Sequence, residues 1–419
     1  MTILNACTWS FACLLLTACS ASAPPPGPAA AIDTAVAAPR QPVPVEPAAE
    51  PEPVERAMPD SAPRDPTVVG GALDVTRTVR ICAGGDVLLG NNLDTLWAGR
   101  ASARFGIPVK PFPDPDALLA PLRPLVRDAD LVLLNVEGAI GEGPAPPKCR
   151  PGSTSCYAFR QPVTTADALA RFAVPAPVVG NVANNHALDA GLDGYETTIR
   201  SLVQSGARIT GNDTLPTLVV TGDGRDTIAV LGFSTFRAGP DARDLTAMRR
   251  HVARAFARYR RVVVSVHMGA EGRGAQRTRD ETELFLGEDR GNPVAFARAA
   301  TEAGAAVVIG HGPHVLRATE WRGDALVFYS LGNLLTYGPF NQADPNDRGG
   351  IACTTIDAIG RALQASFRST YQIPPGIVAI DPSAKGASLM DSLGVLDFPA
   401  TGARVLPDGR VERRAPGKQ

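Results

Sequence analysis

The sequence has almost no net charge, few lysines and no long hydrophobic run. Its 419 residues include 41 Lys and Arg against 42 Asp and Glu, so charge gives no reason to expect nucleic acid as a partner. The basic charge is mostly arginine, and the lysines are Lys110, Lys148, Lys385 and Lys418. No segment approaches the ~20 apolar residues of a transmembrane helix. The glycine-rich signature of a P-loop nucleotide site is also missing.

Histidine is scarce as well, and its placement is the most informative feature of the chain. Four of the five histidines follow apolar runs and have Gly or Asn within two residues: His186, His267, His311 and His314. His251 is the exception. Imidazole is the commonest side-chain metal ligand and the usual acid or base near neutral pH. We therefore expect the four histidines to form one site that is assembled from distant segments.

The first 19 residues are predicted to be an export signal. Residues 9–18 are mostly apolar but too short to span a bilayer, and Leu-Thr-Ala-Cys, ending at Cys19, resembles a bacterial lipobox with a lipidated cysteine. Residues 1–10 contain no Lys or Arg, which leaves an ordinary cleaved signal as the alternative. Residues 20–76 are rich in Pro and Ala and are predicted to be a disordered linker. We expect an exported lipoprotein that is anchored to a membrane.

The other cysteines fit an exported protein. Three of the seven cysteines lie in the predicted signal. Cys149 and Cys156 flank a short polar loop and are expected to form a disulfide in an oxidising compartment, with two free thiols as the alternative. Cys82 and Cys353 lie in apolar runs and are expected to be packed, inert thiols.

Apolar runs alternate with helical patterns from residue 77 onward, which indicates βαβ units of an α/β fold. Residues 138–163 are rich in Gly and Pro and are predicted to be an inserted loop. The expected domain covers residues 77–340, and a C-terminal extension, residues 341–419, is expected to pack on it with irregular strands. The predicted strands cover residues 79–83, 131–136, 178–183, 227–233, 262–267, 306–310 and 326–330. The predicted helices cover residues 115–129, 165–172, 191–205, 241–259 and 292–303.

Polar residues follow the first two predicted strands. Asp86 comes after an apolar strand and a Gly-Gly pair, at the strand edge where ligands collect in open α/β sheets. Asn135 and Glu137 end the next strand two positions apart, so their side chains point to the same face. Carboxylates are hard oxygen ligands for divalent metals. Each acid could also be an ordinary turn residue.

Histidine and asparagine follow the later strands. Asn184, Asn185 and His186 lie between a strand and a helix that begins near Asp189, and this dense polar group is hard to explain by structure alone. His267 ends another buried strand. His311 and His314 lie three residues apart on a turn that contains Gly and Pro, where two imidazoles can face one ion. Taken singly, each histidine could be a satisfied core residue. Three further polar residues near strand ends are Glu271, Ser330 and Asn333.

The order of these motifs resembles the CapA family, which is associated with poly-γ-glutamate capsule synthesis and has a fold similar to the calcineurin-like metallophosphoesterases. The matching stretches, within about residues 78–340, are GGDVLLG, LLNVEGAI, VANNHALDAG, VHMGAEG, IGHGPHV and YSLGNLL. The resemblance implies a layered α/β fold with central β-sheets flanked by helices. It also implies one or two divalent ions, with Mn, Zn or Fe expected.

The resemblance also implies roles for individual residues. His186, with Asp189, would be catalytic, and His186 would donate a proton to the leaving group. The residues implied to face the metal are Asp86, Glu137, Asn135, Asn185, His267, His311 and His314. The residues expected to support them by hydrogen bonds are Asn184, Glu271, Ser330 and Asn333.

Two departures from the metallophosphoesterase pattern bear on the number of metal ions. That pattern has Asp-x-His after the first strand, whereas Asp86 is followed by Val87 and Leu88. Its last histidine pair is His-x-His, whereas two residues separate His311 from His314. One ligand of a two-metal site is therefore missing.

Two functions remain open on this basis. The first is a metal-dependent hydrolase or transferase that acts on a polyanionic polymer or a phosphate ester; its metal would lower the pKa of a bound water toward ~7, with His186 as general acid. The second is a non-catalytic protein that binds a polyanion during capsule polymer synthesis, export or attachment. In either case the expected partners are capsule synthase or export components and, through the lipid anchor, a membrane.

Overall fold

The computed structural model describes residues 76–150, 156–340 and 342–414. All of them belong to the second of two compact units of the chain, Pro53–Gln419. The predicted signal with Cys19, and all but the last residue of the predicted linker, lie outside the described residues. No helix within the described ranges is long and apolar enough to cross a membrane.

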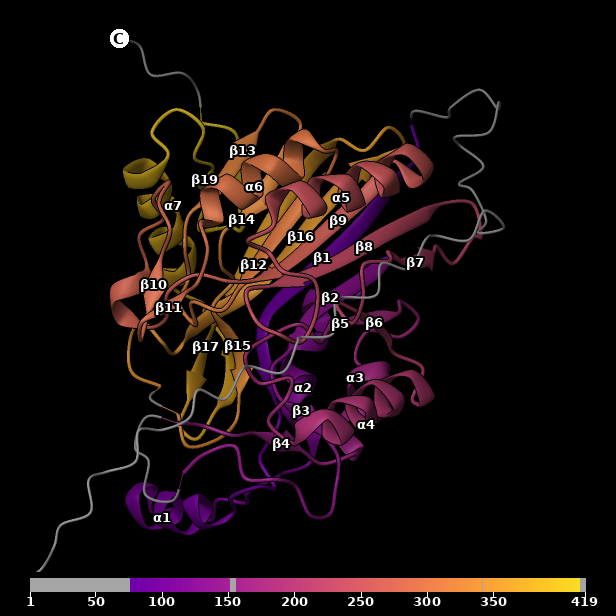
Figure 1. Cartoon of the computed structure of the whole chain (residues 1–419). Helices are drawn as coiled ribbons and strands as arrows, with labels where there is room; N and C mark the ends of the chain where they lie inside the picture. Colours follow the sequence, from indigo (N-terminus) through magenta and orange to yellow (C-terminus); the bar gives the residue numbers. More distant parts are fainter. Residues whose placement is uncertain (1–75, 151–155, 341, 415–419) are drawn as a thin grey trace, which may run out of the picture. The chain divides into compact units, whose positions relative to one another are not determined.

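Two β-sheets form the centre of the described part (Figure 1). The first sheet runs in the order β19-β20-β17-β16-β1-β2-β5-β6, with β15 also paired to β1 and β18 to β17. Its strands are β1 (Thr78–Leu88), β2 (Leu131–Val136), β5 (Val178–Asn181), β6 (Arg208–Thr210), β15 (Asn333–Thr336), β16 (Arg348–Asp357), β17 (Ala362–Ile373), β18 (Ile377–Ile380), β19 (Arg404–Val405) and β20 (Arg410–Glu412).

The second sheet has six strands in the order β13-β14-β12-β9-β8-β7. Its strands β8, β9, β12 and β14 are mutually parallel, as are β1, β2, β5 and β6 in the first sheet. The strands are β7 (Thr217–Val220), β8 (Thr227–Ser234), β9 (Arg261–His267), β12 (Val307–His311), β13 (Thr319–Arg322) and β14 (Ala325–Phe328). Two short pairs complete the strands: β3 (Ala139–Ile140) with β4 (Arg160–Gln161), and β10 (Leu284–Phe285) with β11 (Glu288–Asp289).

Helices cover the outer faces of both sheets. Side chains of α2, α3 and α4 share one apolar cluster with the first sheet, and those of α5 and α6 share another with the second. Figure 1 shows the ribbons of α5 and α6 lying over strands of the second sheet. The helices are α1 (Leu96–Phe105), α2 (Pro115–Leu119), α3 (Thr164–Arg171), α4 (Gly191–Gln204), α5 (Leu245–Tyr259), α6 (Pro293–Glu302) and α7 (Lys385–Asp397), with 3-10 turns η1 (Ala120–Leu125) and η2 (Arg273–Ala275). The predicted layered α/β fold, with central sheets flanked by helices, is confirmed.

Alternation along the strands sorts their side chains between two cores. In β2, Leu131 and Leu133 join the apolar cluster between the sheets, whereas Val132 and Leu134 join the cluster beneath the helices. In β12, Val307 and Ile309 likewise face the other sheet. Because side chains alternate with a period of two, Asn135 and His311 also point between the two sheets. This inter-sheet layer is where the polar strand ends meet.

Several elements differ from the sequence-based expectation. Pro121 and Pro124 lie within the predicted helix 115–129, which splits into the short α2 and the 3-10 turn η1, as expected when proline removes helical hydrogen bonds. The predicted loop 138–163 contains the small β3–β4 pair. The extension of residues 341–419, expected to have irregular strands, instead contributes two long regular strands, β16 and β17, and β16 pairs antiparallel with β1 in the middle of the sheet.

The structure contains two disulfides among the described residues. One joins Cys149 to Cys156, the pair expected from the sequence. The other joins Cys82 to Cys353, so the prediction of two inert thiols was wrong. These two cysteines are register partners on β1 and β16, with their Cα atoms 4.0 Å apart. No local sequence signal indicates this pairing, because the residues are 271 positions apart.

Candidate metal centre

The site lies at the carboxyl ends of strands from both sheets. Asp86 on β1 is in register with Asn135 on β2, and His267 on β9 is in register with His311 on β12. Gly85 allows the backbone of β1 to approach β15, because a Cβ added there would lie 1.8 Å from the carbonyl oxygen of Gly332. The backbone N–H of Asp86 donates to that same oxygen at 3.0 Å. Close packing of two strands thus fixes the position of the Asp86 carboxylate.

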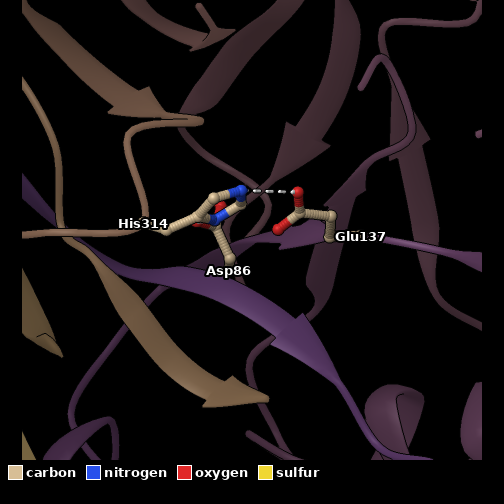
Figure 2. Close-up of side chains that lie close together, drawn as sticks. All are labelled: Asp86, Glu137 and His314. Carbon is tan, nitrogen blue, oxygen red and sulfur yellow. Dashed lines mark hydrogen bonds and ion pairs between the residues drawn. The ribbon is translucent and has the colours of Figure 1, made fainter. Parts of the chain in front are cut away.

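Asp86, Glu137 and His314 form the centre of the group. Each offers one ligand atom, and these atoms all lie within 4.8 Å of one another. The Nδ1 atom of His314 is 3.0 Å from an oxygen of Asp86, and its Nε2 atom is 3.5 Å from an oxygen of Glu137. Figure 2 shows the imidazole pointing toward Glu137 with Asp86 beside it. The three residues come from β1, from the position directly after β2 and from the turn after β12.

Three further predicted ligands surround this centre. Asn135 donates a hydrogen bond to Asp86 at 2.8 Å, and its amide nitrogen lies 3.1 Å from Nδ1 of His267. His267 Nε2 is 3.9 Å from Glu137, and His311 Nδ1 is 3.7 Å from Asp86. The structure therefore brings residues from separate strands of both sheets into one cluster.

The turn that carries His314 is held in an uncommon backbone conformation. His314 has φ of 56°, in the left-handed region, and follows Gly312 with φ of 108°. A non-glycine residue in this region is energetically unfavourable, and such residues concentrate at functional sites. Here the conformation places the imidazole between two carboxylates.

Burial and mutual charge shift the protonation of the cluster. Burial and then the negative charge of Asp86 raise the pKa of Glu137 well above its ordinary value. Burial acts to raise the pKa of Asp86, but the hydrogen bond and charge of His314 outweigh it and lower this pKa to about 2. Burial acts to lower the pKa of His314, but Glu137 and Asp86 outweigh it and raise this pKa to about 10. Without a cation the centre thus retains protons at neutral pH.

The pKa values of the two strand-end histidines, His267 and His311, are lowered, whereas that of His314 is raised. Burial lowers the pKa of His311 to about 4, and burial also lowers the pKa of His267 well below its ordinary value. Both imidazoles are therefore neutral at neutral pH, which is the form that binds a metal ion.

The residues present fit a divalent metal ion. Five buried side-chain atoms of predicted ligands have no hydrogen-bond partner in the described part of the chain: Oε1 of Glu137, Oδ1 of Asn185, Nε2 of His267 and both ring nitrogens of His311. A buried polar atom without a partner costs about 1–3 kcal/mol. A cation would satisfy several of them at once, and mixed imidazole, carboxylate and amide donors suit Zn, Mn or Fe.

His186 belongs to a second group beside this cluster. Its Nδ1 atom lies 2.7 Å from Oδ2 of Asp189, which also accepts a hydrogen bond from the backbone of Phe159 at 2.6 Å. Lys148 forms an ion pair with the other oxygen of Asp189. Burial lowers the pKa of His186, although Asp189 opposes this shift. The carboxylate fixes the ring through Nδ1, which leaves Nε2 for a ligand.

The four predicted supporting residues have different surroundings. Asn184 donates to Asn135 at 3.3 Å and to the carbonyl of Val136 at 2.9 Å. Oε2 of Glu271 lies 3.7 Å from Nε2 of His314. Asn333 is in register with Asp86 and donates to the carbonyl of residue 346 at 3.2 Å. The hydroxyl of Ser330 accepts a hydrogen bond within its own turn at 3.2 Å, so this contact supports the turn and not the cluster.

Three residues near the site had no role assigned from the sequence. Arg290 is 2.6 Å from Glu271 and holds that carboxylate in place. The ring of Phe159 packs 4.6 Å from the ring of His186. Lys148 is one of only four lysines, and its position beside Cys149 places it near the polar loop, which is a weak signal. Arginine and phenylalanine are too common in this sequence to carry a signal.

The chain belongs to a family of bacterial capsule synthesis proteins. The family model described as bacterial capsule synthesis protein PGA_cap matches residues 80–337. This range includes all of the residues in the cluster and the His186 group. The family expected from the ordered motifs is therefore confirmed.

Two curated relatives agree with this assignment. The PGA biosynthesis protein CapA of Bacillus subtilis (strain 168) is 29% identical over 170 residues, which cover 37% of this chain and 41% of the relative. The capsule biosynthesis protein CapA of Bacillus anthracis is 27% identical over 173 residues, covering 37% of this chain and 39% of the relative. The matched segment thus spans about two fifths of each relative.

Two solved structures are partly similar to the structure of this chain. A 5'-nucleotidase precursor from Thermus thermophilus matches with a TM-score of 0.37 and 13% identity, over 77% of this chain and 60% of that one. GAP50, described as the anchor in the inner membrane complex of Plasmodium, matches with a TM-score of 0.36 and 8% identity. The match covers 73% of this chain and 88% of that one. At these scores we draw no functional conclusion from either structure.

Proposed function

We propose that this chain acts in capsule polymer synthesis, export or attachment as a metal-dependent hydrolase or transferase whose substrate is a polyanionic polymer or a phosphate ester. The observation that carries the proposal is the convergence of Asp86, Glu137 and His314, together with buried atoms of Glu137, His267 and His311 that have no hydrogen-bond partner within the described residues. When bound, the metal ion supplies positive charge that polarises the scissile bond and activates a water.

A few residues would bind the metal ion and donate the proton in this reaction. Asp86, Glu137, His267, His311 and His314 would hold the ion. Through its contact with Asp189, His186 would be oriented to donate its Nε2 proton to the leaving oxygen of a phosphate ester as the bond to that oxygen breaks. The attacking water would form the new bond and release a proton to solvent. Burial lowers the pKa of His186, and an approaching anionic substrate favours the protonated ring. Proton delivery is thereby linked to substrate binding.

A metal and turnover assay tests the proposal. Purified protein is analysed for bound metal and for hydrolysis of a generic phosphodiester and of γ-linked polyglutamate with added Mn²⁺ or Zn²⁺. We expect bound metal, and turnover that falls about 100-fold or more in His186→Ala. The matched control is His251→Gln on α5, outside the cluster, which should retain activity. Absence of metal and of turnover, with His186→Ala indistinguishable from the parent, would refute catalysis.

One observation favours a non-catalytic alternative. Leu88, the position at which the metallophosphoesterase pattern has a histidine, is only 1% exposed and belongs to the apolar interior. A site with one ligand fewer suits a single ion that binds a polyanion without cleaving it. Bound metal and retained polymer binding, without turnover of either substrate, would identify this second function.

We also propose that the protein is exported and anchored through Cys19. Support comes from the lipobox-like sequence and from the two disulfides, since such bonds persist mainly in oxidising compartments. In cells, Cys19→Ser should shift the protein from the membrane fraction to the soluble fraction. An unchanged distribution would contradict the anchor.

A further inference from the structure

The carboxylate of Asp189 has three partners. Its side chain is fully buried, and Oδ2 lies 2.7 Å from Nδ1 of His186. The backbone N–H of Phe159 donates to the same oxygen at 2.6 Å. The ammonium of Lys148 pairs with the other oxygen, Oδ1, and also donates to the backbone carbonyl of Asn185 at 3.3 Å. Lys148 therefore contacts both the residue that orients His186 and the backbone of a predicted metal ligand.

The segment that contains Phe159 is anchored by its own contacts. Phe159 directly precedes β4, and its carbonyl accepts a hydrogen bond from the backbone of Ala139 at 3.1 Å. Its ring is buried against the ring of His186. The carbonyl of Ala158 accepts a hydrogen bond from the side chain of Asn91 at 3.2 Å. This segment thus keeps its place without help from Lys148.

The backbone around Lys148 has fewer anchors. Residues 144–149 form no backbone–backbone hydrogen bond with any residue of the described ranges. The side chain of Lys148 is 35% exposed, and an ion pair that is open to solvent does little to hold a chain in place. The next residue, Cys149, is joined by a disulfide to Cys156, which lies in the anchored segment. The disulfide therefore connects the weakly held lysine to the anchored part of the loop.

The two disulfides differ in their access to solvent. Cys82 and Cys353 are 0% and 2% exposed, within the apolar core. Cys149 and Cys156 are only half-buried. Thiol–disulfide exchange requires an attacking thiolate to reach a sulfur atom. A dithiol reductant should therefore reduce the bond between Cys149 and Cys156 first.

We propose that Lys148 is a positioning residue for the Asp189–His186 pair and that the Cys149–Cys156 disulfide holds it there, so that proton donation requires the oxidised protein. In the reduction, a dithiol supplies two electrons and two protons. The S–S bond breaks, two thiols form, and the reductant closes to its own disulfide. The inference rests on the proposed function, because it concerns how the proton donor of that reaction is held.

Loss of Lys148 acts on the proton donor through the carboxylate. Oδ1 of Asp189 is then left buried without a partner, which is unfavourable for an ionised group. The carboxylate turns or takes up water, and the imidazole of His186 loses the fixed direction of its Nε2 atom. A misplaced donor slows the breaking of the ester bond, whereas substrate and metal still bind. The expected change is therefore in kcat and not in KM.

The first measurement follows the lysine directly and needs no turnover. The chain has four lysines, so an amine-acylating reagent followed by mass spectrometry gives a separate rate for each. Lys110 and Lys385 are exposed and serve as internal references. In oxidised protein we expect Lys148 to react at least about threefold more slowly than the references, because its ammonium is paired. Mild treatment with a dithiol, or Cys149→Ser with Cys156→Ser, should remove this protection.

The second measurement follows turnover and metal content in the full chain. Lys148→Met removes the charge with little change in size, and Lys148→Arg retains the charge. Lys110→Met is the matched control at an exposed lysine outside the site. For Lys148→Met and for the double serine variant we expect kcat of phosphodiester hydrolysis to fall about 10-fold or more, with KM and bound metal unchanged. Lys148→Arg should recover part of the loss, and Lys110→Met should match the parent.

The two measurements separate the possible failures. Protection of Lys148 that survives both reduction and the serine substitutions would overturn the proposal, because the disulfide would then not hold the lysine. Full kcat in Lys148→Met, or loss of bound metal in that variant, would also overturn it. A parent without turnover would refute the proposed function, whereas an active parent with unprotected Lys148 would refute the positioning role alone. If the double serine variant does not fold, reduction of the parent supplies the same comparison.

Discussion

Displacement of the proton on His314 gives a sharp test of metal binding. Although burial opposes it, the charges of Glu137 and Asp86 raise the pKa of His314 to about 10. At pH 7 the ring therefore carries a proton, and removing it costs about 4 kcal/mol, at 1.36 kcal/mol for each of about three pH units. A metal that binds this ring must displace the proton. Apparent metal affinity should then rise about tenfold per pH unit for each displaced proton between about pH 7 and 9.

The assay is a titration of the metal-free protein with Zn²⁺ or Mn²⁺ across this pH range. Calorimetry in buffers of different ionisation enthalpy counts the protons released. The variant is His314→Asn, because asparagine tolerates the left-handed φ of 56° found at this position. It should lower the slope of log affinity against pH by about one. His251→Gln, outside the cluster, should keep the slope of the parent.

The sign of the effect follows from the direction of the shift. A raised pKa means that the free protein holds the proton more tightly, so metal binding is weaker at low pH and stronger at high pH. Any slope that remains in His314→Asn would report Glu137, whose pKa is also raised. An affinity that does not depend on pH, or the same slope in parent and variant, would show that His314 is not displaced and is no ligand.

Three further predictions concern the support of the site. Gly85→Ala places a Cβ 1.8 Å from a backbone oxygen and should lower the free energy of unfolding by about 3 kcal/mol or more; a denaturation midpoint like that of the parent would contradict this. Replacing Cys82 and Cys353 with alanine should cost about 2–5 kcal/mol, and unchanged denaturation of the double variant would show that the bond is not stabilising. Asp189→Asn should reduce hydrolysis about 10- to 100-fold at constant metal content, because His186 loses its charged acceptor; full activity would exclude that role.

The sequence predicted where the polar strand ends meet better than it predicted the supporting framework. Apolar runs with Asp86, Asn135, His267 and His311 at their ends indicated both the strands and the edge at which they meet. This worked because parallel strands covered on both faces have a strong hydrophobic signal. The motif order then indicated the family. The detailed roles of the ligands stay predictions.

The pairing of strands that lie far apart in the sequence could not be predicted from the sequence. The partner of β1 on one side is β16, which begins at Arg348, and no local pattern specifies which distant strand will pair. The Cys82–Cys353 disulfide was missed for the same reason. The contact of Lys148 with Asp189 also depends on how a Gly- and Pro-rich segment folds over the site, which propensity does not determine.

The central place of β16 has a consequence for how the chain is made. Thr78–Gly84 of β1 pair with Ile351–Asp357 of β16, so a nascent chain that has reached residue 340 holds every proposed ligand but leaves this stretch of β1 without a partner on one side. Non-local pairing of this kind forms late, and an unpaired strand edge is prone to aggregation. The ligands therefore emerge well before the scaffold that positions them.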